Sequence, residues 1–203
     1  MTKQVEFFFD FGSPYSYLAY KALPGIAAAH GAQIVWRPML LGGVFKATGN
    51  HSPAETPAKG KWLQQDLRRW AQRYSVAFEH NPHFPVNTLT LMRGAVGLQS
   101  QGPVFHKYME AIFHAMWGEP RNLGAPDELA AVLHRAGISA ETFQSLVNDP
   151  AVKEQLKKNT EEAIARGVFG APTFFIGDEM HWGQDRLDFV AAALSSATLA
   201  RKA

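Results

Sequence analysis

The chain of 203 residues contains no cysteine. This absence excludes disulfide bonds, a Cys-x-x-Cys redox centre and any metal site built from thiolates of this chain. If sulfur chemistry takes place here, the thiol must therefore come from a second molecule.

Long apolar runs and an excess of one charge are missing as well. No run approaches the roughly 20 apolar residues that a membrane-spanning helix needs. The net charge is +2 and the charges are interspersed, so we expect neither a nucleic-acid partner nor a membrane anchor. The N-terminus enters a strand pattern directly, without the regions of a secretory signal, and this favours a cytoplasmic protein.

The residues that are present predict a β-α-β unit at the N-terminal end. With 46% hydrophobic residues the chain can bury one sizeable core. Residues 5–9 are apolar and aromatic, as in a buried strand, and the apolar spacing of residues 14–30 suits a helix. Residues 34–36 begin a second strand that stops at Pro38, and units of this size have parallel strands.

The turn between the first strand and its helix is the first candidate for chemistry. Gly12 interrupts the apolar run, Ser13 can cap the helix, and Pro14 suits the first helical position. A helix that starts here leaves backbone N–H groups unpaired and places the positive end of its dipole at the turn. Such a turn favours an anion, with the Ser13 hydroxyl beside it. The alternative is that Ser13 serves only as a helix cap.

The central part of the chain predicts an all-helical insertion without a convincing strand. The expected helices cover residues 62–74, 88–101, 103–117, 126–136, 140–146 and 152–166. Gly42, Gly43 and the stretch 48–61, which has two prolines and two glycines, are expected to form a long irregular loop. A rigid loop is expected at 81–87, where prolines stand on either side of Phe84.

The C-terminal end returns to β structure. Residues 173–176 are strongly β-prone, and residues 180–182 complete a hairpin before a last helix that starts at 183–185. The chain is thus predicted as an α/β fold with two parts. Residues 1–41 and 168–203 form one domain, and residues 42–167 form the helical insertion.

This order of elements, with Pro172 directly before the third strand, resembles the thioredoxin superfamily. More narrowly, the chain resembles the kappa-class glutathione transferases and the bacterial 2-hydroxychromene-2-carboxylate isomerases. The matching segments are 10–18, Lys46 with 49–50, 118–119, 169–173, 177–180 and 182–186, in the expected order. The resemblance implies a thioredoxin-like β-α-β…β-β-α domain, a cis peptide bond at Ala171-Pro172, bound glutathione and a homodimer.

The resemblance also implies which residues hold glutathione. Ser13 stands where a thiol-active relative carries cysteine, and its hydroxyl would donate to the sulfur while the helix dipole favours the thiolate. Ala171, before Pro172, would pair its backbone with the tripeptide as an added strand. The γ-glutamyl end would meet the turn formed by Trp182, Gly183, Gln184 and Asp185, and Asn50 belongs to the same side. Asp185 would accept the amino group, and its alternative role is a simple helix cap.

The co-substrate, a small aromatic carboxylate, is expected between this face and the helical insertion. A cation should then face the sulfur, and Lys46 occupies the matching position. Phe84 and Trp62 are expected to form an aromatic wall, although a core residue held by two prolines explains Phe84 nearly as well. Lys59 and Lys61 are weaker candidates, because lysines in loops are usually solvated.

The implied reaction is the reversible, glutathione-assisted isomerisation of 2-hydroxychromene-2-carboxylate to trans-o-hydroxybenzylidenepyruvate, in aromatic hydrocarbon (naphthalene) catabolism. The thiol adds, the ring opens, the former double bond rotates and the thiol leaves unconsumed. Two alternatives are a kappa-like transferase or peroxidase and a redox-inactive thioredoxin-fold module that binds extended peptides. A metal hydrolase would use His80, His83, His106 and His114, which lack a carboxylate at clear ligand spacing, so no metal is expected.

Overall fold

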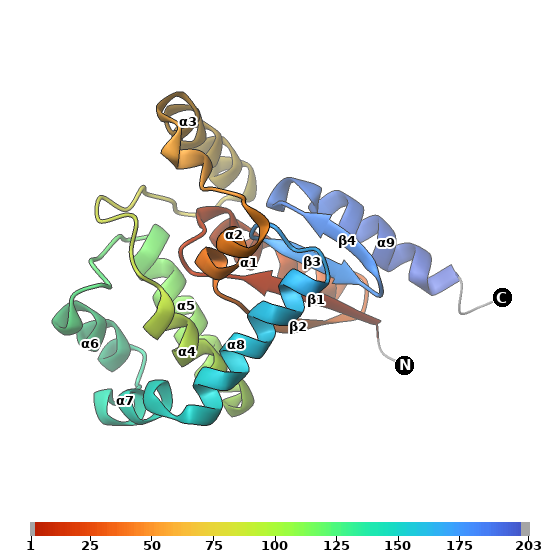
Figure 1. Cartoon of the computed structure of the whole chain (residues 1–203). Coiled ribbons are helices and arrows are strands. Elements are labelled where there is room, and N and C mark those ends of the chain that lie inside the picture. Colours follow the sequence, from red (N-terminus) through yellow and green to blue (C-terminus); the bar gives the residue numbers. More distant parts are fainter. Residues whose placement is uncertain (1–2, 200–203) are drawn as a thin grey trace.

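The computed structural model describes residues 3–199 and contains a four-stranded sheet in the order β2-β1-β3-β4 (Figure 1). The strands are β1 (Lys3–Phe9), β2 (Ala32–Pro38), β3 (Thr173–Ile176) and β4 (Glu179–Trp182). β1 and β2 pair in parallel, whereas β3 runs antiparallel to both β1 and β4. Because α1 (Pro14–Ala29) connects β1 with β2, the predicted β-α-β unit is confirmed. The antiparallel pair of β3 and β4 confirms the predicted hairpin.

The other helices lie between β2 and β3 and after β4. Between β2 and β3 are α2 (Leu41–Thr48), α3 (Pro57–Tyr74), α4 (Leu89–Leu98), α5 (Pro103–Trp117), α6 (Pro126–Arg135), α7 (Ala140–Asn148) and α8 (Pro150–Ala165), with 3-10 turns η1 (Pro53–Glu55) and η2 (Gln99–Gln101). After β4, η3 (Gln184–Arg186) leads into α9 (Leu187–Leu199). Residues 42–167, all within the described part, contain no strand, as predicted. None of the helices within residues 3–199 is both long and apolar enough to cross a membrane.

The expectation of one long irregular loop around residues 42–61 is wrong at both ends. Gly42 and Gly43 lie inside α2, and residues 57–61 begin α3. Pro57 starts α3 because a proline at the first helical position needs no N–H partner. A Cβ added to Gly43 would lie 3.2 Å from the Thr160 methyl group, so the missing side chain lets α2 approach α8 closely.

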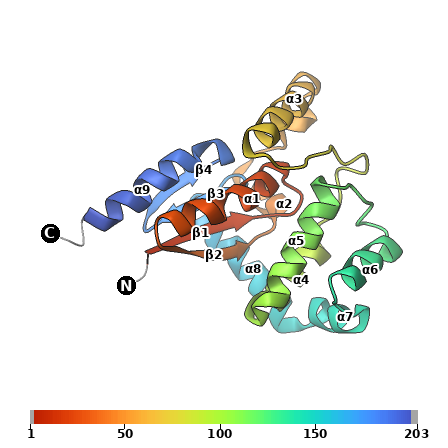
Figure 2. The ribbon, with the colours of Figure 1, turned by 180° about the vertical axis from the view of Figure 1, so that it is seen from behind.

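The sheet separates two hydrophobic clusters, because alternate side chains of a strand point to opposite faces. Phe7 and Phe9 of β1 join Phe174 of β3 in the larger cluster. Phe8 points the other way and packs with Phe175 in the smaller cluster, which includes residues of α2 and α8. Figure 2 shows α1 and α9 side by side on one face of the sheet, and in Figure 1 α8 crosses the opposite face.

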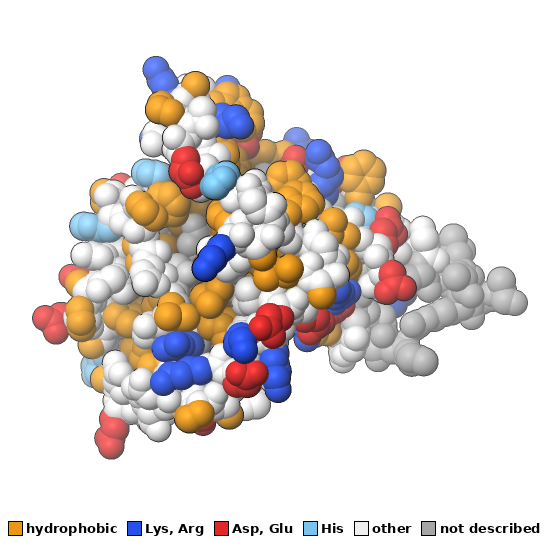
Figure 3. All heavy atoms as spheres, viewed as in Figure 1, with side chains coloured by type: hydrophobic (Ala, Val, Ile, Leu, Met, Phe, Trp, Pro, Cys, Tyr) orange, Lys and Arg blue, Asp and Glu red, His pale blue; other side chains and the backbone are white. Residues whose placement is uncertain are grey.

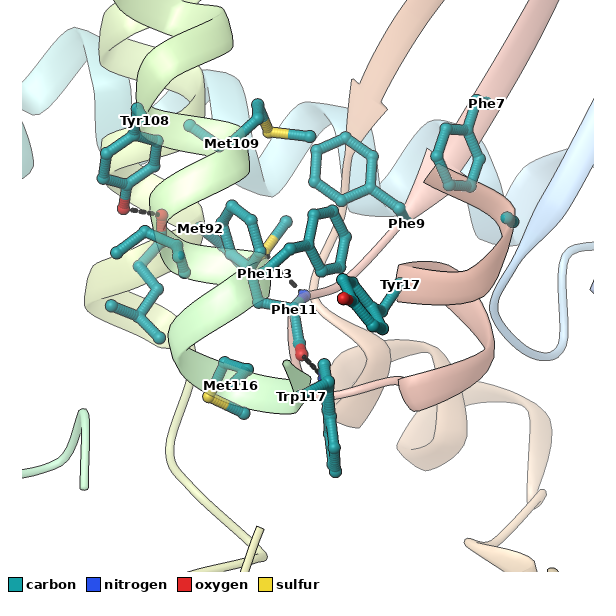
Figure 4. Packing of buried hydrophobic residues seen from close by; sticks show 14 of the residues in the cluster. Phe7, Phe9, Phe11, Tyr17, Met92, Tyr108, Met109, Phe113, Met116 and Trp117 are labelled. Atoms are coloured by element: carbon teal, nitrogen blue, oxygen red, sulfur yellow. Dashed lines mark hydrogen bonds between the residues drawn. The ribbon is translucent and has the colours of Figure 1, made fainter. Parts of the chain in front are cut away.

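Phe11 carries the larger cluster from the sheet into the helical part (Figure 4). Its ring lies 4.7 Å from the Phe113 ring of α5, measured between centroids. The Phe11 N–H points to the Met92 sulfur at 3.4 Å, and its carbonyl accepts a 2.8 Å hydrogen bond from Trp117 Nε1. The chain is therefore fixed between sheet and helices immediately before the turn that contains Ser13.

Candidate functional site

The candidate site lies where the N-terminus of α1 meets the segment before β3. Ser13 caps α1, and its Oγ accepts a 3.1 Å hydrogen bond from the Ser16 N–H. The same hydroxyl donates to the Ala171 carbonyl oxygen at 3.0 Å, and Ser13 is only 5% exposed. Helix capping and contact with the Ala171 segment are thus carried out by one oxygen atom, so the cap role does not exclude the site role.

The segment 169–172 is held by hydrogen bonds to four successive carbonyls, and its Ala171–Pro172 peptide bond is cis, as expected. The pairs are Asn50 Nδ2 to Phe169 O (2.8 Å), Thr173 Oγ1 to Gly170 O (2.8 Å), Ser13 Oγ to Ala171 O (3.0 Å) and Gly183 N to Pro172 O (2.9 Å). The N–H of Ala171, in contrast, has no hydrogen-bond partner within residues 3–199. One backbone donor next to the Ser13 hydroxyl is therefore available to a ligand.

Asn50 connects the end of α2 to this segment. Its Nδ2 donates to the Phe169 carbonyl, and its Oδ1 accepts the His51 N–H at 2.9 Å. Gly49, the C-cap of α2, has φ +70°, a value that favours glycine and lets the chain turn toward Phe169. Both ends of the Asn50 amide are used within the chain, so its observed role is to position the segment 169–172.

Trp182 forms one wall beside the same segment. The centroid of its ring lies 4.8 Å from that of the Phe169 ring. Trp182 is 49% exposed, which is enough to meet a ligand. A Cβ added to Gly170 would lie 2.6 Å from Trp182 Nε1, so the close approach of the indole requires glycine at that position.

The turn after Trp182 places one carboxylate near the start of the last helix. Gly183 has φ +103°, and Gln184 is buried. The Asp185 carboxylate pairs with Arg186, at 2.7 Å between Oδ2 and Nη1. Within residues 3–199 no backbone N–H donates to the Asp185 carboxylate, and Gly183 occupies the cap position of η3, so the structure does not show Asp185 as a simple helix cap.

The residues expected to meet the co-substrate lie on separate elements. Lys46 is exposed in the last turn of α2, and Trp62 is 54% exposed on α3. Phe84 is half-buried and packs on Trp117, at 5.7 Å between ring centroids, which suits both a pocket wall and a core contact. No hydrogen bond, ion pair or ring contact within residues 3–199 joins any of the three to Ser13.

Lys59 and Lys61 belong to α3 rather than to a loop, and both are exposed. Figure 3 shows Lys and Arg side chains on α3, at the top of the view. Among the residues that the structure describes, no group of three or more His, Asp or Glu side chains is arranged to hold a metal ion.

Asp10 is a site residue whose role the sequence analysis missed. It is 2% exposed, and its two carboxylate oxygens accept the N–H groups of Gly12 and Leu41, each at 2.9 Å. Burial raises the pKa of Asp10, and the hydrogen bonds from Gly12, Leu41 and Thr88 oppose that rise. An Asp two residues before a turn glycine is a local signal for the first of these bonds. The bond to Leu41, which joins the Ser13 turn to α2, has no local signal.

Two tyrosine hydroxyls attach α3 beside the site. Tyr15, two residues after Ser13, donates to Asp66 Oδ2 at 2.9 Å, and Tyr74 donates to the Gln184 carbonyl at 2.9 Å. Burial, followed by Asp66, raises the pKa of Tyr15, and burial raises the pKa of Tyr74 to about 12. Both hydroxyls therefore stay protonated and remain donors at neutral pH. Their partners are 51 and 110 residues away, a separation that no sequence pattern indicates.

Comparison with known proteins agrees with this geometry. A family model described as a DSBA-like thioredoxin domain matches residues 4–195. The 2-hydroxychromene-2-carboxylate isomerase of Sphingobium xenophagum is 35% identical over 199 residues, which covers 96% of this chain and 99% of that protein. Glutathione S-transferase kappa 1 of Homo sapiens is 28% identical over 211 residues, covering 96% of this chain and 92% of the transferase. A solved structure of 2-hydroxychromene-2-carboxylate isomerase matches with a TM-score of 0.86 and 32% identity, covering 98% of each chain. Relatives of both kinds support an enzyme of the thioredoxin superfamily.

Proposed function

Because the chain belongs to the DsbA-like thioredoxin domain family, together with the 2-hydroxychromene-2-carboxylate isomerases and the kappa-class glutathione transferases, we propose that it is a glutathione-dependent isomerase. It would interconvert 2-hydroxychromene-2-carboxylate and trans-o-hydroxybenzylidenepyruvate in the catabolism of aromatic hydrocarbons such as naphthalene. When bound, glutathione supplies the thiolate that adds to the conjugated double bond of the substrate and later leaves.

One observation carries the proposal: a hydroxyl at a helix N-terminus lies beside an unpaired backbone N–H. The Ser13 hydroxyl can donate to an anionic sulfur, and the dipole of α1 favours the negative charge. The N–H of Ala171 suits a peptide carbonyl, as in the addition of an extended strand. A chain without cysteine that offers both groups fits a thiol-bearing peptide.

The other residues of this side would hold and orient the tripeptide. Pro172 and Asn50 fix the segment from which Ala171 donates. The turn formed by Trp182, Gly183, Gln184 and Asp185 would hold the γ-glutamyl end. There, the Asp185 carboxylate would accept from the amino group, and the N–H groups at the start of η3 would donate to the carboxylate.

The substrate would lie against the helical part. Lys46 would attract its carboxylate, and Phe84 and Trp62 would contact its aromatic ring. We further propose that the protein works as a cytoplasmic homodimer. Residues 1–41 and 168–203 would form its glutathione domain, and residues 42–167 the insertion that shapes the substrate pocket.

The test is turnover with and without glutathione. Purified protein is incubated with the chromene carboxylate, and product is followed by ultraviolet absorbance while glutathione is quantified. We expect isomerisation that requires glutathione and leaves its concentration unchanged. Faster conjugation of an aryl halide, with glutathione consumed, would indicate a kappa-like transferase instead.

Calorimetric titration with glutathione separates the enzyme from a peptide-binding module. We expect saturable binding of glutathione to the wild-type protein. Retention of extended peptides without any binding of glutathione would contradict the proposal.

A further inference from the structure

The Ser13 hydroxyl has one hydrogen, and the structure shows where that hydrogen is used. Its oxygen accepts from the Ser16 N–H at 3.1 Å, so this neighbour takes a lone pair and not the hydrogen. The hydrogen is donated to the Ala171 carbonyl, at 3.0 Å between the two oxygens. A hydroxyl in this state cannot donate to a sulfur at the same time.

The Ala171 carbonyl is also the acceptor that an added peptide strand would use. A strand pairs through both backbone groups of a residue, and the N–H of Ala171 is the unpaired half of such a pair. The neighbouring carbonyls of Phe169, Gly170 and Pro172 accept from donors that are not proposed to act on the sulfur, so those bonds can persist when a ligand arrives. Among these four carbonyls, only that of Ala171 accepts from the group proposed to act on the ligand's sulfur.

We propose that the backbone of the bound peptide releases the Ser13 hydroxyl: a ligand N–H takes over the Ala171 carbonyl, and the hydroxyl turns to the ligand's sulfur. This inference rests on the proposed function. The thiol proton leaves to solvent, and the Ser13 hydrogen stays on its own oxygen as a donor throughout. The exchange is favourable because a hydrogen bond to an anion is stronger than one to a neutral carbonyl. Stabilisation of the thiolate would thus depend on the cysteinyl N–H as well as on Ser13.

The experiment compares glutathione with an analogue in which the γ-glutamyl–cysteine amide N–H is replaced by an ester oxygen. Each ligand is bound at saturation to the wild-type protein, and its thiolate is titrated by ultraviolet difference absorbance against the protein with S-methylglutathione. We expect bound glutathione to ionise about one pH unit lower than the bound ester analogue, which is about tenfold in the ionisation constant.

Two variants show whether the difference passes through Ser13. In Ser13→Ala the two ligands should ionise at the same pH, and Ser13→Thr, which keeps a hydroxyl, should restore the gap. Equal ionisation of the two ligands in the wild-type protein would overturn this inference and leave the proposed function standing. Failure of glutathione itself to bind would overturn both.

Discussion

The two sides of the candidate site are fixed to very different degrees. Around Ser13 and Ala171, hydrogen bonds join residues that are 158 and 119 positions apart in the chain. On the proposed substrate side, the side chains of Lys46 and Trp62 have no hydrogen-bond or ion-pair partner within residues 3–199. A rigid side suits a constant ligand, whereas exposed side chains on separate elements can change with little effect on the fold. Substitutions on the two sides should therefore differ in kind as well as in size.

The largest effect should come from removing the Ser13 hydroxyl. We expect Ser13→Ala to lower kcat by about 10²–10³-fold, the range found when one donor to a developing anion is lost. The bound thiol should ionise closer to the pKa of about 8.5 of a free thiol, so the rising limb of the pH–rate profile should move to higher pH. Stopped-flow or steady-state assays across pH measure both changes.

Loss of the helix cap must be separated from loss of the catalytic donor. Removing a serine cap costs about 1 kcal/mol of unfolding free energy, too little to unfold most domains. Ser13→Thr keeps a capping hydroxyl and should recover a measurable part of the activity. An unchanged pH profile in Ser13→Ala would remove Ser13 from its proposed role.

The next largest effect should be on stability, at Asp10. Asp10→Ala leaves the N–H groups of Gly12 and Leu41 without acceptors. Because two partly buried donors lose their partners, we expect the free energy of unfolding to fall by about 2–4 kcal/mol. Urea denaturation measures this directly. A loss within the few tenths of a kcal/mol that surface substitutions cause would show that Asp10 does not hold the turn.

The ionisation of Asp10 also makes the free energy of unfolding depend on pH. Burial raises its pKa above the ordinary value of 3.8, so the folded chain binds this proton more tightly than the unfolded chain does. The resulting stability is complete below pH 3.8 and is lost as the pH rises through the folded-state pKa. A carboxyl-carbon NMR titration should therefore give a midpoint above 3.8. A midpoint below that value would mean that the N–H donors outweigh burial.

The sequence predicts the side around Ser13 and Ala171 better than the proposed substrate side, for a physical reason. Ser13 and Ala171-Pro172 belong to a strand–turn–helix and to a proline before a strand, so local chemistry marks them. The ties that complete this side, Asp10 to Leu41 and Tyr15 to Asp66, depend on how distant elements pack.

The errors in the fold have a related cause. Glycine and proline at residues 42–61 are usual loop signals, yet Pro57 starts a helix and Gly43 allows two helices to touch. Composition alone does not distinguish a glycine that bends the chain from one that permits close packing. The roles assigned to Lys46, Phe84 and Trp62 stay predictions, since no hydrogen bond, ion pair or ring contact within residues 3–199 joins them to Ser13.

A smaller effect is expected at Asn50, on binding rather than on chemistry. Asn50→Ala removes the 2.8 Å bond to the Phe169 carbonyl, so the segment that carries Ala171 loses one support. We expect KM for glutathione to rise about tenfold, equivalent to about 1.4 kcal/mol, with a smaller change in kcat. Asn148→Ala removes a similar 2.9 Å bond to a backbone carbonyl on α7 and should leave KM unchanged. Equal changes in both variants would point to a general loss of stability.

The smallest effect should come from Lys46, on the side where the structure holds little in place. Its ammonium is exposed, so attraction to a substrate carboxylate is weakened by water and is worth about 0.2–1 kcal/mol. Lys46→Gln should therefore raise KM for the chromene carboxylate by at most about fivefold at low salt, and the difference from wild type should shrink as salt is added. Lys158→Gln removes an equally exposed charge on α8 and should change neither KM nor its salt dependence. Because neither lysine supports the fold, both variants should unfold at the wild-type denaturant concentration. A Lys46 effect that persists at high salt would mean that the ammonium is desolvated against the substrate. The proposed substrate side would then close around its ligand when the ligand binds.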